Sequence, residues 1–237
     1  MQGVILAGGK GSRLLPLTNI VNKFLLPVYN KPLIEYSIES LVKANIHEII
    51  IVLGNKSAGD TIEYLKSGEK YNCHFTYIYQ EHPLGVANAL YCVKNLIRDN
   101  IVVMCADNII LDDISKFINN FKSGCFISCK TFNNDDLKRF AVAKIINNKI
   151  VCFEEKPRIP GSNIAFAGIQ IYDNNVFNII DTLKPSNRNE YEITDVINSY
   201  IKNNNFSYDL LKEDWIDAGT PDSLLEAQNK IFHLLHK

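Results

Sequence analysis

The chain has 237 residues, of which 46% are hydrophobic and 22% charged, with a formal net charge of −1 at pH 7. Such a composition is that of a soluble globular protein with a large core, and near-zero charge argues against nucleic-acid or anionic-membrane partners. The apolar run from Gly3 to Ala7 is too short for a signal-peptide core, and no stretch approaches the length that spans a bilayer. We therefore expect a cytoplasmic protein with no membrane or nucleic-acid partner.

The cysteines form no C-x-x-C pair, and the five histidines have no metal-ligand spacing relative to them. Most cysteines fall within apolar strand or helix patterns, which predicts reduced core thiols in place of disulfides or a zinc site. The six positions are Cys73, Cys92, Cys105, Cys125, Cys129 and Cys152.

Strand and helix patterns alternate through the first half of the chain. After the strand at 3–7, a helix begins at Lys31-Pro32 and has Ile34, Ile38 and Leu41 on one face. The alternation predicts a parallel α/β sheet, whose ligands gather where the strands end. The remaining strands are expected at 48–53, 74–79 and 101–105, and the helices at about 57–66 and 86–97.

The second half is richer in strand patterns, and no repeat or linker divides it from the first. Thr220 is a good helix N-cap, and Pro221 suits the first position of a helix. We expect strands at 125–132, 141–146, 150–154 and 164–172, with a turn at 147–149 and helices at about 192–202 and 221–235.

A glycine-rich loop follows the first strand, at Gly8, Gly9 and Gly11. Glycines let a ligand approach the main chain, whose successive N–H groups form an anion-binding concavity. Ser12 adds a hydroxyl donor, and Arg13 adds a fork of donors that suits phosphate. The spacing is neither Gly-x-Gly-x-x-Gly nor a P-loop. The alternatives are a polyphosphate loop and an ordinary tight turn.

Other polar side chains follow predicted strands. Gln80 could pair with the edge of a base, or belong to a surface turn. Asp107 comes just past the strand at 101–105, and Asp217 stands in Trp-Ile-Asp-Ala-Gly-Thr-Pro, where turn chemistry is the alternative to a metal site. Residues 154–157, Glu-Glu-Lys-Pro, read by themselves as a solvated strand end.

The full loop sequence carries a resemblance. Gly9-x-Gly-Ser-Arg-Leu-x-Pro-x-Thr18, followed by Lys23-x-x-x-Pro27, resembles the signature of sugar-1-phosphate nucleotidyltransferases, and most closely that of short-form glucose-1-phosphate thymidylyltransferases. The match extends from Gly3 to about Ala227. It implies an α/β fold of one Rossmann-like (GT-A-like) nucleotidyltransferase domain over residues 1–237, with a mixed, mostly parallel sheet flanked by helices. Its nucleotide-binding half is about 1–110, and its sugar-phosphate-binding half about 111–237.

The resemblance also implies roles for individual residues. Nucleotide binding falls to Leu6, Ala7, Gly8, Gly9, Gly11, Ser12, Arg13, Gln80 and Gly85. Sugar-phosphate binding falls to Asn108, Phe140, Ala141, Glu155, Lys156, Phe166 and Glu192. Mg²⁺ would be held by Asp107 and Asp217, since this ion takes oxygen ligands and keeps phosphates and waters in its shell. The catalytic set is Arg13, Lys23, Asp107, Lys156 and Asp217.

The implied reaction joins a sugar 1-phosphate to the α-phosphorus of dTTP and releases pyrophosphate, within a homo-oligomer. UTP or CTP is the alternative donor, because Gln80 and Gly85 do not uniquely specify thymine. One alternative is a glycosyltransferase, which would need Asp-x-Asp after a strand, where this chain has Asp107-Asn-Ile. Another is an inactive regulatory subunit, which would be expected to have lost cationic or carboxylate side chains that this chain retains.

The chain departs from the family pattern near the expected sugar site. Phe24 follows the lysine in place of Gln or His, and Asn189 replaces a Gly. Phe140-Ala141 replaces Tyr-Gly, and Ala167 replaces a Thr. Since a site built to bond a hydroxyl discriminates strongly, these losses favour a deoxy or substituted sugar as the alternative to glucose.

Overall fold

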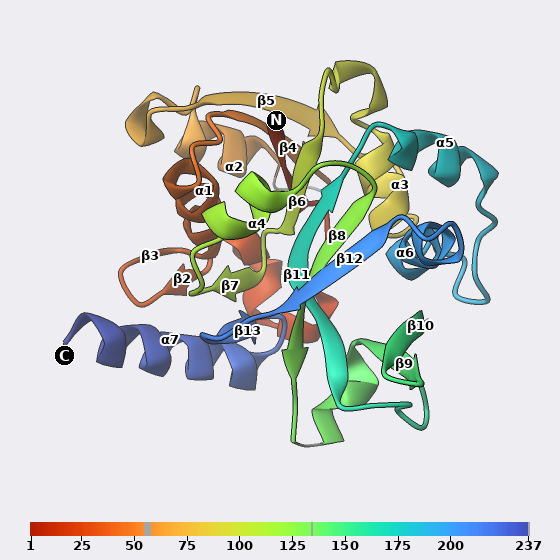
Figure 1. Ribbon diagram of the computed structural model, residues 1–237. Coiled ribbons are helices and arrows are strands. Elements are labelled where there is room, and N and C mark those ends of the chain that lie inside the picture. Colours follow the sequence, from red (N-terminus) through yellow and green to blue (C-terminus); the bar gives the residue numbers. More distant parts are fainter. Residues whose placement is uncertain (55–57, 134, 237) are drawn as a thin grey trace.

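A twisted sheet of nine strands forms the centre of the computed structural model, which describes residues 1–54, 58–133 and 135–236 (Figure 1). Along its main path the order is β10-β9-β11-β6-β1-β4-β5, while β8 pairs with β11 and β12 pairs with β8. The strands are β1 (Gln2–Ala7), β4 (Glu48–Leu53), β5 (His74–Tyr79), β6 (Ile101–Cys105), β8 (Cys125–Thr131), β9 (Ala141–Ile146), β10 (Lys149–Glu155), β11 (Ile164–Tyr172) and β12 (Phe206–Leu210).

The first half of the chain supplies the parallel part of this sheet. β1 lies between β4 and β6 and runs parallel to both, and β5 runs parallel to β4. Ala7, Leu53 and Cys105 therefore end their strands at one edge, and the polar residues that follow them gather there. The second half adds antiparallel neighbours, since β11 runs antiparallel to β6, β8 and β9. The mixed α/β sheet expected from the sequence is confirmed.

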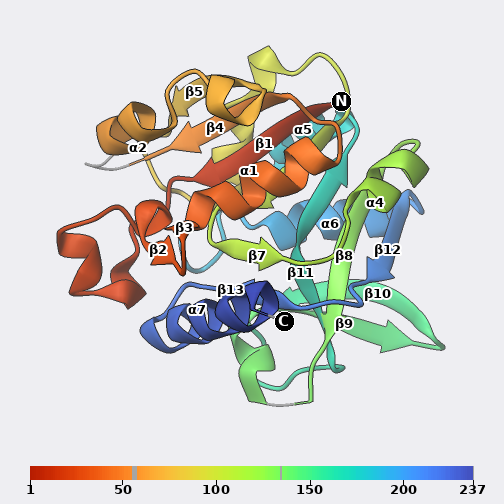
Figure 2. The same ribbon diagram turned by 90° about the vertical axis from the view of Figure 1, so that its left-hand side faces the viewer.

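Helices cover both faces of the sheet (Figures 1 and 2). Alternate residues of β1 face opposite ways, so Val4 and Leu6 pack with α3, α5 and α6, whereas Ile5 and Ala7 pack with α1, α2 and α4. The helices are α1 (Leu33–Lys43), α2 (Ala58–Leu65), α3 (Val86–Tyr91), α4 (Ser115–Asn120), α5 (Asn175–Thr182), α6 (Ile193–Lys202) and α7 (Pro221–Leu235).

Two short ribbons and α7 form a third apolar cluster below the sheet (Figure 2). One ribbon pairs β2 (Pro27–Val28) with β3 (Lys31–Pro32), and the other pairs β7 (Asn108–Ile110) with β13 (Trp215–Asp217). Leu14, which follows the glycine loop, is fully buried in this cluster beside Ala218. The cluster therefore fixes the loop at residues 8–13 against the segment that follows Asp217.

Most predicted elements are present, with differences at their ends. The helix expected at 86–97 was wrong in length: α3 ends at Tyr91, and a separate 3-10 turn spans Lys94–Leu96. The cause is the return to β6, because the Gln2 side chain bonds both Leu96 O and Arg98 N and holds the chain in a turn. Ser57, the expected start of the next helix upstream, lies outside the described residues.

The C-terminal helix begins as expected. Thr220 and Ser223 form a capping box, with Pro221 in the first turn. The short strands β2, β3, β7 and β13, the helices α4 and α5, and the exposed strand β12 were not predicted. None of the described helices is long and apolar enough to cross a membrane.

All six cysteines are free thiols, as expected. The prediction that they lie in the core holds for Cys73, Cys125 and Cys129. It was wrong for Cys92, which is exposed, because the helix that carries it ends there and leaves its side chain at the surface. Cys105 and Cys152 are partly exposed.

A buried carboxylate ties α1 to α2. One oxygen of Glu35, Oε1, accepts hydrogen bonds from the hydroxyls of Tyr64 and Tyr71, both at 2.6 Å, and from Nζ of Lys70 at 3.0 Å. Burial by itself raises the pKa of Glu35, but the bonds from the tyrosines and Lys70 outweigh it and hold this pKa below its ordinary value.

Replacing this carboxylate should make stability less sensitive to acid. Because the folded pKa of Glu35 is depressed, its contribution is present above its ordinary pKa of 4.5 and is lost as pH falls through the folded value. We expect Glu35→Gln to lower the free energy of unfolding by about 1.5–3 kcal/mol at pH 7, the range for hydrogen bonds to a charged group. The deficit should shrink below pH 4.5 in urea unfolding.

Glu39→Gln is the matched control on the same helix. Its ion pair with Lys31 is partly exposed, so we expect a loss of less than about 1 kcal/mol. A Glu35→Gln deficit that stayed constant with pH would contradict the assignment of the charge to Glu35.

Candidate active site

A cavity of about 490 Å³ opens at the edge where the parallel strands end. The glycine loop and Gln80, predicted nucleotide-binding segments that are far apart in the sequence, both line this cavity. Of the predicted residues it contains Leu6, Gly8, Gly9, Ser12, Arg13, Lys23, Gln80, Gly85 and Asp107. Ala7 is fully buried beneath it in the core. The lining also includes residues that the sequence did not single out: Lys10, Pro83, Val86, Ala89, Cys105 and Glu190.

The glycine loop needs its glycines for close packing. Gly11 adopts a left-handed conformation, with φ of 67°, and its carbonyl accepts from Leu14 N and from the Thr18 hydroxyl, both at 2.9 Å. A Cβ at Gly11 would lie 3.2 Å from Cβ of Lys23, and one at Gly9 would lie 3.4 Å from its Nζ. The loop therefore leaves a path for the lysine side chain along its surface.

Gln80 is held in one orientation. It is 5% exposed, and its amide Nε2 donates to Oδ1 of Asn88 at 2.8 Å. A Cβ at Gly8 would lie 2.6 Å from Oε1 of Gln80, so the carbonyl end faces the glycine loop. Gly85 has a φ of 103° and packs against the backbone of Tyr191. These contacts give the cavity a fixed amide close to the loop.

The two predicted metal ligands come from strands that pair. β7 follows Asp107, and β13 ends at Asp217, which lies opposite Asn108 in the antiparallel register. The backbone N–H of Ala218 donates to the Asp107 carbonyl at 2.9 Å. This ribbon brings carboxylates far apart in sequence to the same edge of the sheet.

Charge distinguishes the two carboxylates. Oδ2 of Asp107 lies 2.6 Å from Nζ of Lys23, and Asn108 donates to its Oδ1 at 3.0 Å. Burial by itself raises the pKa of Asp107, but the Lys23 ammonium outweighs it and lowers this pKa. Burial, and secondly the negative charge of Asp107, raise the pKa of Asp217. The positive charges of Arg13, Lys23 and Arg139 act in the opposite direction but do not outweigh these effects.

This donor set fits a magnesium ion better than a transition metal. Within the described part of the chain, His, Cys, Asp and Glu side chains form no group of three or more that could hold a metal. Mg²⁺ is commonly held by one or two carboxylates, with substrate phosphates and waters as the other ligands. A cation between Asp107 and Asp217 would also relieve the repulsion that raises the pKa of Asp217.

Two arginines face Asp217. A Cβ at Gly219 would lie 2.8 Å from Nη2 of Arg13 and 2.9 Å from Oδ1 of Asp217, so the guanidinium and carboxylate share the space beside this glycine. Arg139, which the sequence did not indicate, places Nη2 at 3.7 Å from Oδ2 of Asp217. The only sequence signal for Arg139 was its position directly before Phe140, a predicted site residue.

Three of the seven predicted sugar-phosphate residues, Glu155, Lys156 and Glu192, lie near an arginine that sequence reasoning missed. Arg188 places Nη2 at 3.3 Å from Oε1 of Glu155 and at 2.7 Å from Oε2 of Glu192. Lys156 lies 3.5 Å from the same Glu155 oxygen. Burial raises the pKa of Glu155 although both cations oppose it. The signal was the short spacing of Arg188 from Glu190 and Glu192.

Aromatic side chains stand between the two parts of the site. The Phe140 ring stacks on Phe132 at 5.4 Å and contacts the edge of Trp215 at 4.9 Å. Trp215 donates from Nε1 to Oδ1 of Asn108 at 2.7 Å, which fixes the side chain next to Asp107. Phe166 is half-buried, and Ala141 is 6% exposed.

Ala167 has no exposed surface and packs in the core on the α1 side of the sheet. Its side chain is therefore not open to a ligand in this structure.

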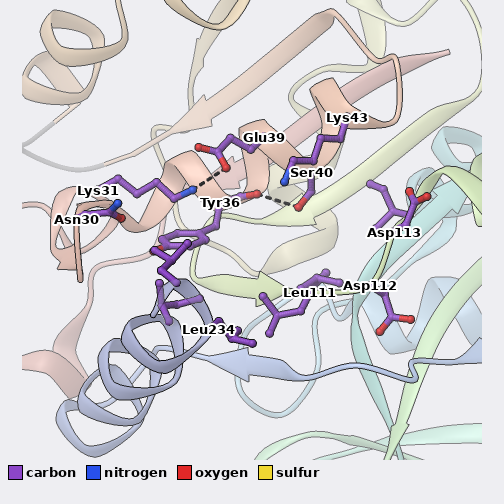
Figure 3. A pocket seen from close by; sticks show the side chains of 14 residues that line it. Asn30, Lys31, Tyr36, Glu39, Ser40, Lys43, Leu111, Asp112, Asp113 and Leu234 are labelled. Atoms are coloured by element: carbon purple, nitrogen blue, oxygen red, sulfur yellow. Dashed lines mark hydrogen bonds and ion pairs between the residues drawn. The ribbon is translucent and has the colours of Figure 1, made fainter. Parts of the chain in front are cut away.

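A second cavity, of about 550 Å³, lies between α1, β7 and the end of α7 (Figure 3). Lys31 and Glu39 form an ion pair at 2.6 Å on its wall, and Leu234 projects into it from α7. Its described lining contains none of the predicted site residues. The candidate active site is therefore the cavity at the strand ends.

Comparisons with known proteins identify relatives of this chain. The Haloferax volcanii low-salt glycan biosynthesis nucleotidyltransferase Agl11 is 37% identical over 98% of this chain and 66% of its own length. A Mycolicibacterium smegmatis glucose-1-phosphate thymidylyltransferase is 36% identical over 97% of this chain and 81% of its own. The crystal structure of a Bacillus anthracis protein provisionally assigned as a glucose-1-phosphate thymidylyltransferase superposes with a TM-score of 0.91 and 41% identity, covering 97% of this chain and 94% of that one.

The family model described as nucleotidyl transferase matches residues 2–233, almost the entire chain. The glycine loop, the paired carboxylates and the mixed sheet all lie within that match. The chain belongs to the nucleotidyl transferase family.

Proposed function

We propose that this protein is a sugar-1-phosphate nucleotidyltransferase that uses dTTP and glucose 1-phosphate to make dTDP-glucose and pyrophosphate. The observation that carries the proposal is the cavity that holds a glycine loop, a fixed amide and the Lys23–Asp107 pair together. The triphosphate would lie on the loop, with its base at Gln80 and Gly85. We also propose that residues 1–237 form one domain, whose halves near residue 110 bind the nucleotide and the sugar phosphate.

Charge repulsion is the main obstacle to the reaction. Two unit negative charges at ~4 Å repel by roughly 4 kcal/mol at an effective dielectric near 20, and several such charges must meet when a phosphate attacks a triphosphate. Arg13 and Lys23, which line the cavity, would stabilise the triphosphate, and Lys156, beside Glu155, would hold the incoming phosphate. Positioning and charge stabilisation supply the rate, because the nucleophile is an oxygen of the substrate.

Mg²⁺ held by Asp107 and Asp217 would supply further positive charge and link the phosphates. Lys23 already keeps Asp107 ionised, since its ammonium lowers the pKa of this carboxyl. The pair therefore presents a charged oxygen ligand at neutral pH, whether or not a cation is bound.

UTP or CTP remains the alternative donor. Gln80 presents an amide, and an amide can pair with the edge of more than one pyrimidine. The support for dTTP comes from the thymidylyltransferase relative and the Bacillus anthracis protein. The Agl11 relative, whose name specifies no base, leaves this choice to experiment.

A non-glucose sugar phosphate is the alternative acceptor. Phe140 turns an apolar ring toward Trp215, and Glu155 and Glu192 both bond Arg188. A site with fewer free hydroxyl partners favours a deoxy or substituted sugar. An inactive nucleotide-sugar-binding subunit is a more distant alternative, which the retained cations and carboxylates argue against.

Pyrophosphate release tests the reaction and the base together. With Mg²⁺ and glucose 1-phosphate, we expect dTTP to give the fastest release among dTTP, UTP, CTP, GTP and ATP. Fastest release with UTP or CTP would identify the alternative base. Release only with amino- or deoxy-sugar phosphates would identify the alternative acceptor. Absence of release with every pair would overturn the proposed reaction.

Asp107→Asn should leave the fold intact and reduce turnover by about 10²–10³-fold, the size of effect seen when one preorganised charge-stabilising group is lost. The substitution keeps the side-chain shape but removes the charge that pairs with Lys23. The measurement is kcat with the best substrate pair, beside the thermal unfolding midpoint. Asp60→Asn, at an exposed position on α2, is the matched control and should keep full turnover. Near-normal kcat for Asp107→Asn would reject a metal or charge role for this residue.

Lys156→Met should raise the KM for the sugar 1-phosphate by about tenfold or more and leave the KM for the nucleotide unchanged. Loss of a hydrogen bond to a charged group costs about 1.5–3 kcal/mol. Lys144→Met is the matched control on the same hairpin: the two lysine side chains are 47% and 51% exposed, and each lies near a glutamate. Equal effects from both variants would show that general surface charge, not Lys156, attracts the sugar phosphate.

A further inference from the structure

Lys23 reaches Asp107 along a path that its neighbours define. Its stem lies against Gly9 and Gly11, and its ammonium lies 4.8 Å from the centroid of the Phe24 ring. The side chain is 10% exposed at its ion pair with Asp107. The direction in which this side chain leaves the backbone therefore decides where its charge lies.

The backbone at Lys23 is a short 3-10 turn, Lys23–Leu25, with Asn22 as its N-cap. Oδ1 of Asn22 accepts from the backbone N–H of Phe24 at 3.0 Å, and its carbonyl accepts from Leu25 N at 2.9 Å. Two of the N–H groups at the start of the turn are thus satisfied by one residue. Asn22 sets the orientation of the turn that carries Lys23.

The Asn22 side chain also attaches this turn to α2. Nδ2 of Asn22 donates to Oγ1 of Thr61 on α2 at 2.9 Å. Thr61 has no exposed surface, and Asn22 is 8% exposed, so the bond is shielded from water. α2 itself is anchored by buried Leu65 and by the bond from Tyr64 to Glu35. The turn that carries Lys23 is therefore attached to α2, which these contacts hold in the fold.

We propose that Asn22 and Thr61 act as positioning residues for Lys23, holding its ammonium where the triphosphate and Asp107 require it. Neither side chain lies in the described lining of the active-site cavity. Their effect passes through the backbone of the 3-10 turn. This inference rests on the proposed function for the role of Lys23, whereas the contacts that carry it are independent of which base or sugar is used.

Loss of the Asn22–Thr61 hydrogen bond should affect the reaction as well as stability, because it would displace the charge of Lys23. Misplacement of a reacting or stabilising group by about 1 Å can reduce a rate by about 10²-fold. Without the Thr61 hydroxyl, the hydrogen bond from Nδ2 of Asn22 to α2 is lost. Its loss weakens the attachment of the turn to α2 and lets the ammonium move away from Asp107.

The test uses two substitutions at Thr61, which is remote from the cavity. Thr61→Val keeps the shape and removes the hydroxyl, whereas Thr61→Ser keeps the hydroxyl. We expect Thr61→Val, like Asn22→Ala, to reduce kcat by about 10–100-fold with little change in the KM for the sugar phosphate. Thr61→Ser should restore turnover to within about threefold of the unmodified protein.

Lys23→Met separates positioning from a structural role. If Thr61 acts through Lys23, Thr61→Val should cause no further loss of turnover in the Lys23→Met background, although it should lower the thermal unfolding midpoint equally in both. Tyr200→Phe is the stability control, because it removes a buried hydroxyl bond to Asp173 near the opposite edge of the sheet. It should lower the unfolding midpoint and keep kcat.

Calorimetric binding of tripolyphosphate gives a readout that needs neither turnover nor a particular base. We expect Thr61→Val to weaken this binding in the Lys23 protein and to leave it unchanged in Lys23→Met. Full turnover and unchanged binding in Thr61→Val would overturn the positioning role while the proposed function stands. If the unmodified protein releases no pyrophosphate, the proposed reaction fails, and tripolyphosphate binding alone decides for or against positioning. Failure of the unmodified protein to bind tripolyphosphate would reject the role of Lys23 in holding a triphosphate, and with it the positioning role, whereas pyrophosphate release alone decides the proposed reaction.

Discussion

The pairing of Lys23 with Asp107 is the interaction around which the site is built. Taking two charges out of water is costly unless each finds a close partner and further hydrogen bonds. Here the partners lie 2.6 Å apart, and Asn108 and the turn at Lys23 complete their surroundings. Position 11 requires glycine, because its backbone has a positive φ and a Cβ there would crowd Thr18 and the stem of the lysine.

The second carboxylate depends on a different constraint, the short ribbon of β7 and β13. Its register sets Asp217 opposite Asn108, and its apolar partners bury Ile109 and Ile216 against α7. The antiparallel half of the chain thus returns a carboxylate to the edge created by the parallel half. Burial and the nearby negative charge of Asp107 raise the pKa of Asp217. A divalent cation would relieve the repulsion between these two carboxylates.

The sequence was most informative where the signal is local or periodic. The strands at β1, β4, β5 and β6 follow from apolar runs, and the loop follows from its glycines, so the place of the cavity and much of its lining could be predicted, but Lys10, Pro83 and Glu190 could not. Arg188 and Arg139 were missed, because their only sequence signals, the nearby Glu190 and Glu192 and the neighbouring Phe140, do not show that Glu155 or Asp217 lies beside them in the fold. The short ribbons were missed because two or three residues carry no periodicity.

Backbone hydrogen bonds join the two halves of the site. Tyr191 donates from N to Leu84 O at 2.7 Å and accepts at O from Ala87 N at 3.2 Å, so the loop after Gln80 and the segment that ends at Glu192 are held together. Gly85 lies at this junction with a φ of 103°, where a Cβ would come within 2.6 Å of the Tyr191 carbonyl. A glycine here is therefore required by the contact between two chain segments, in addition to any contact with a base. The loop after Gln80, proposed to face the base, and the segment of Arg188, which joins Glu155 and Glu192, are therefore held together by these bonds, so one chain connection links the proposed nucleotide side of the site to the proposed sugar side.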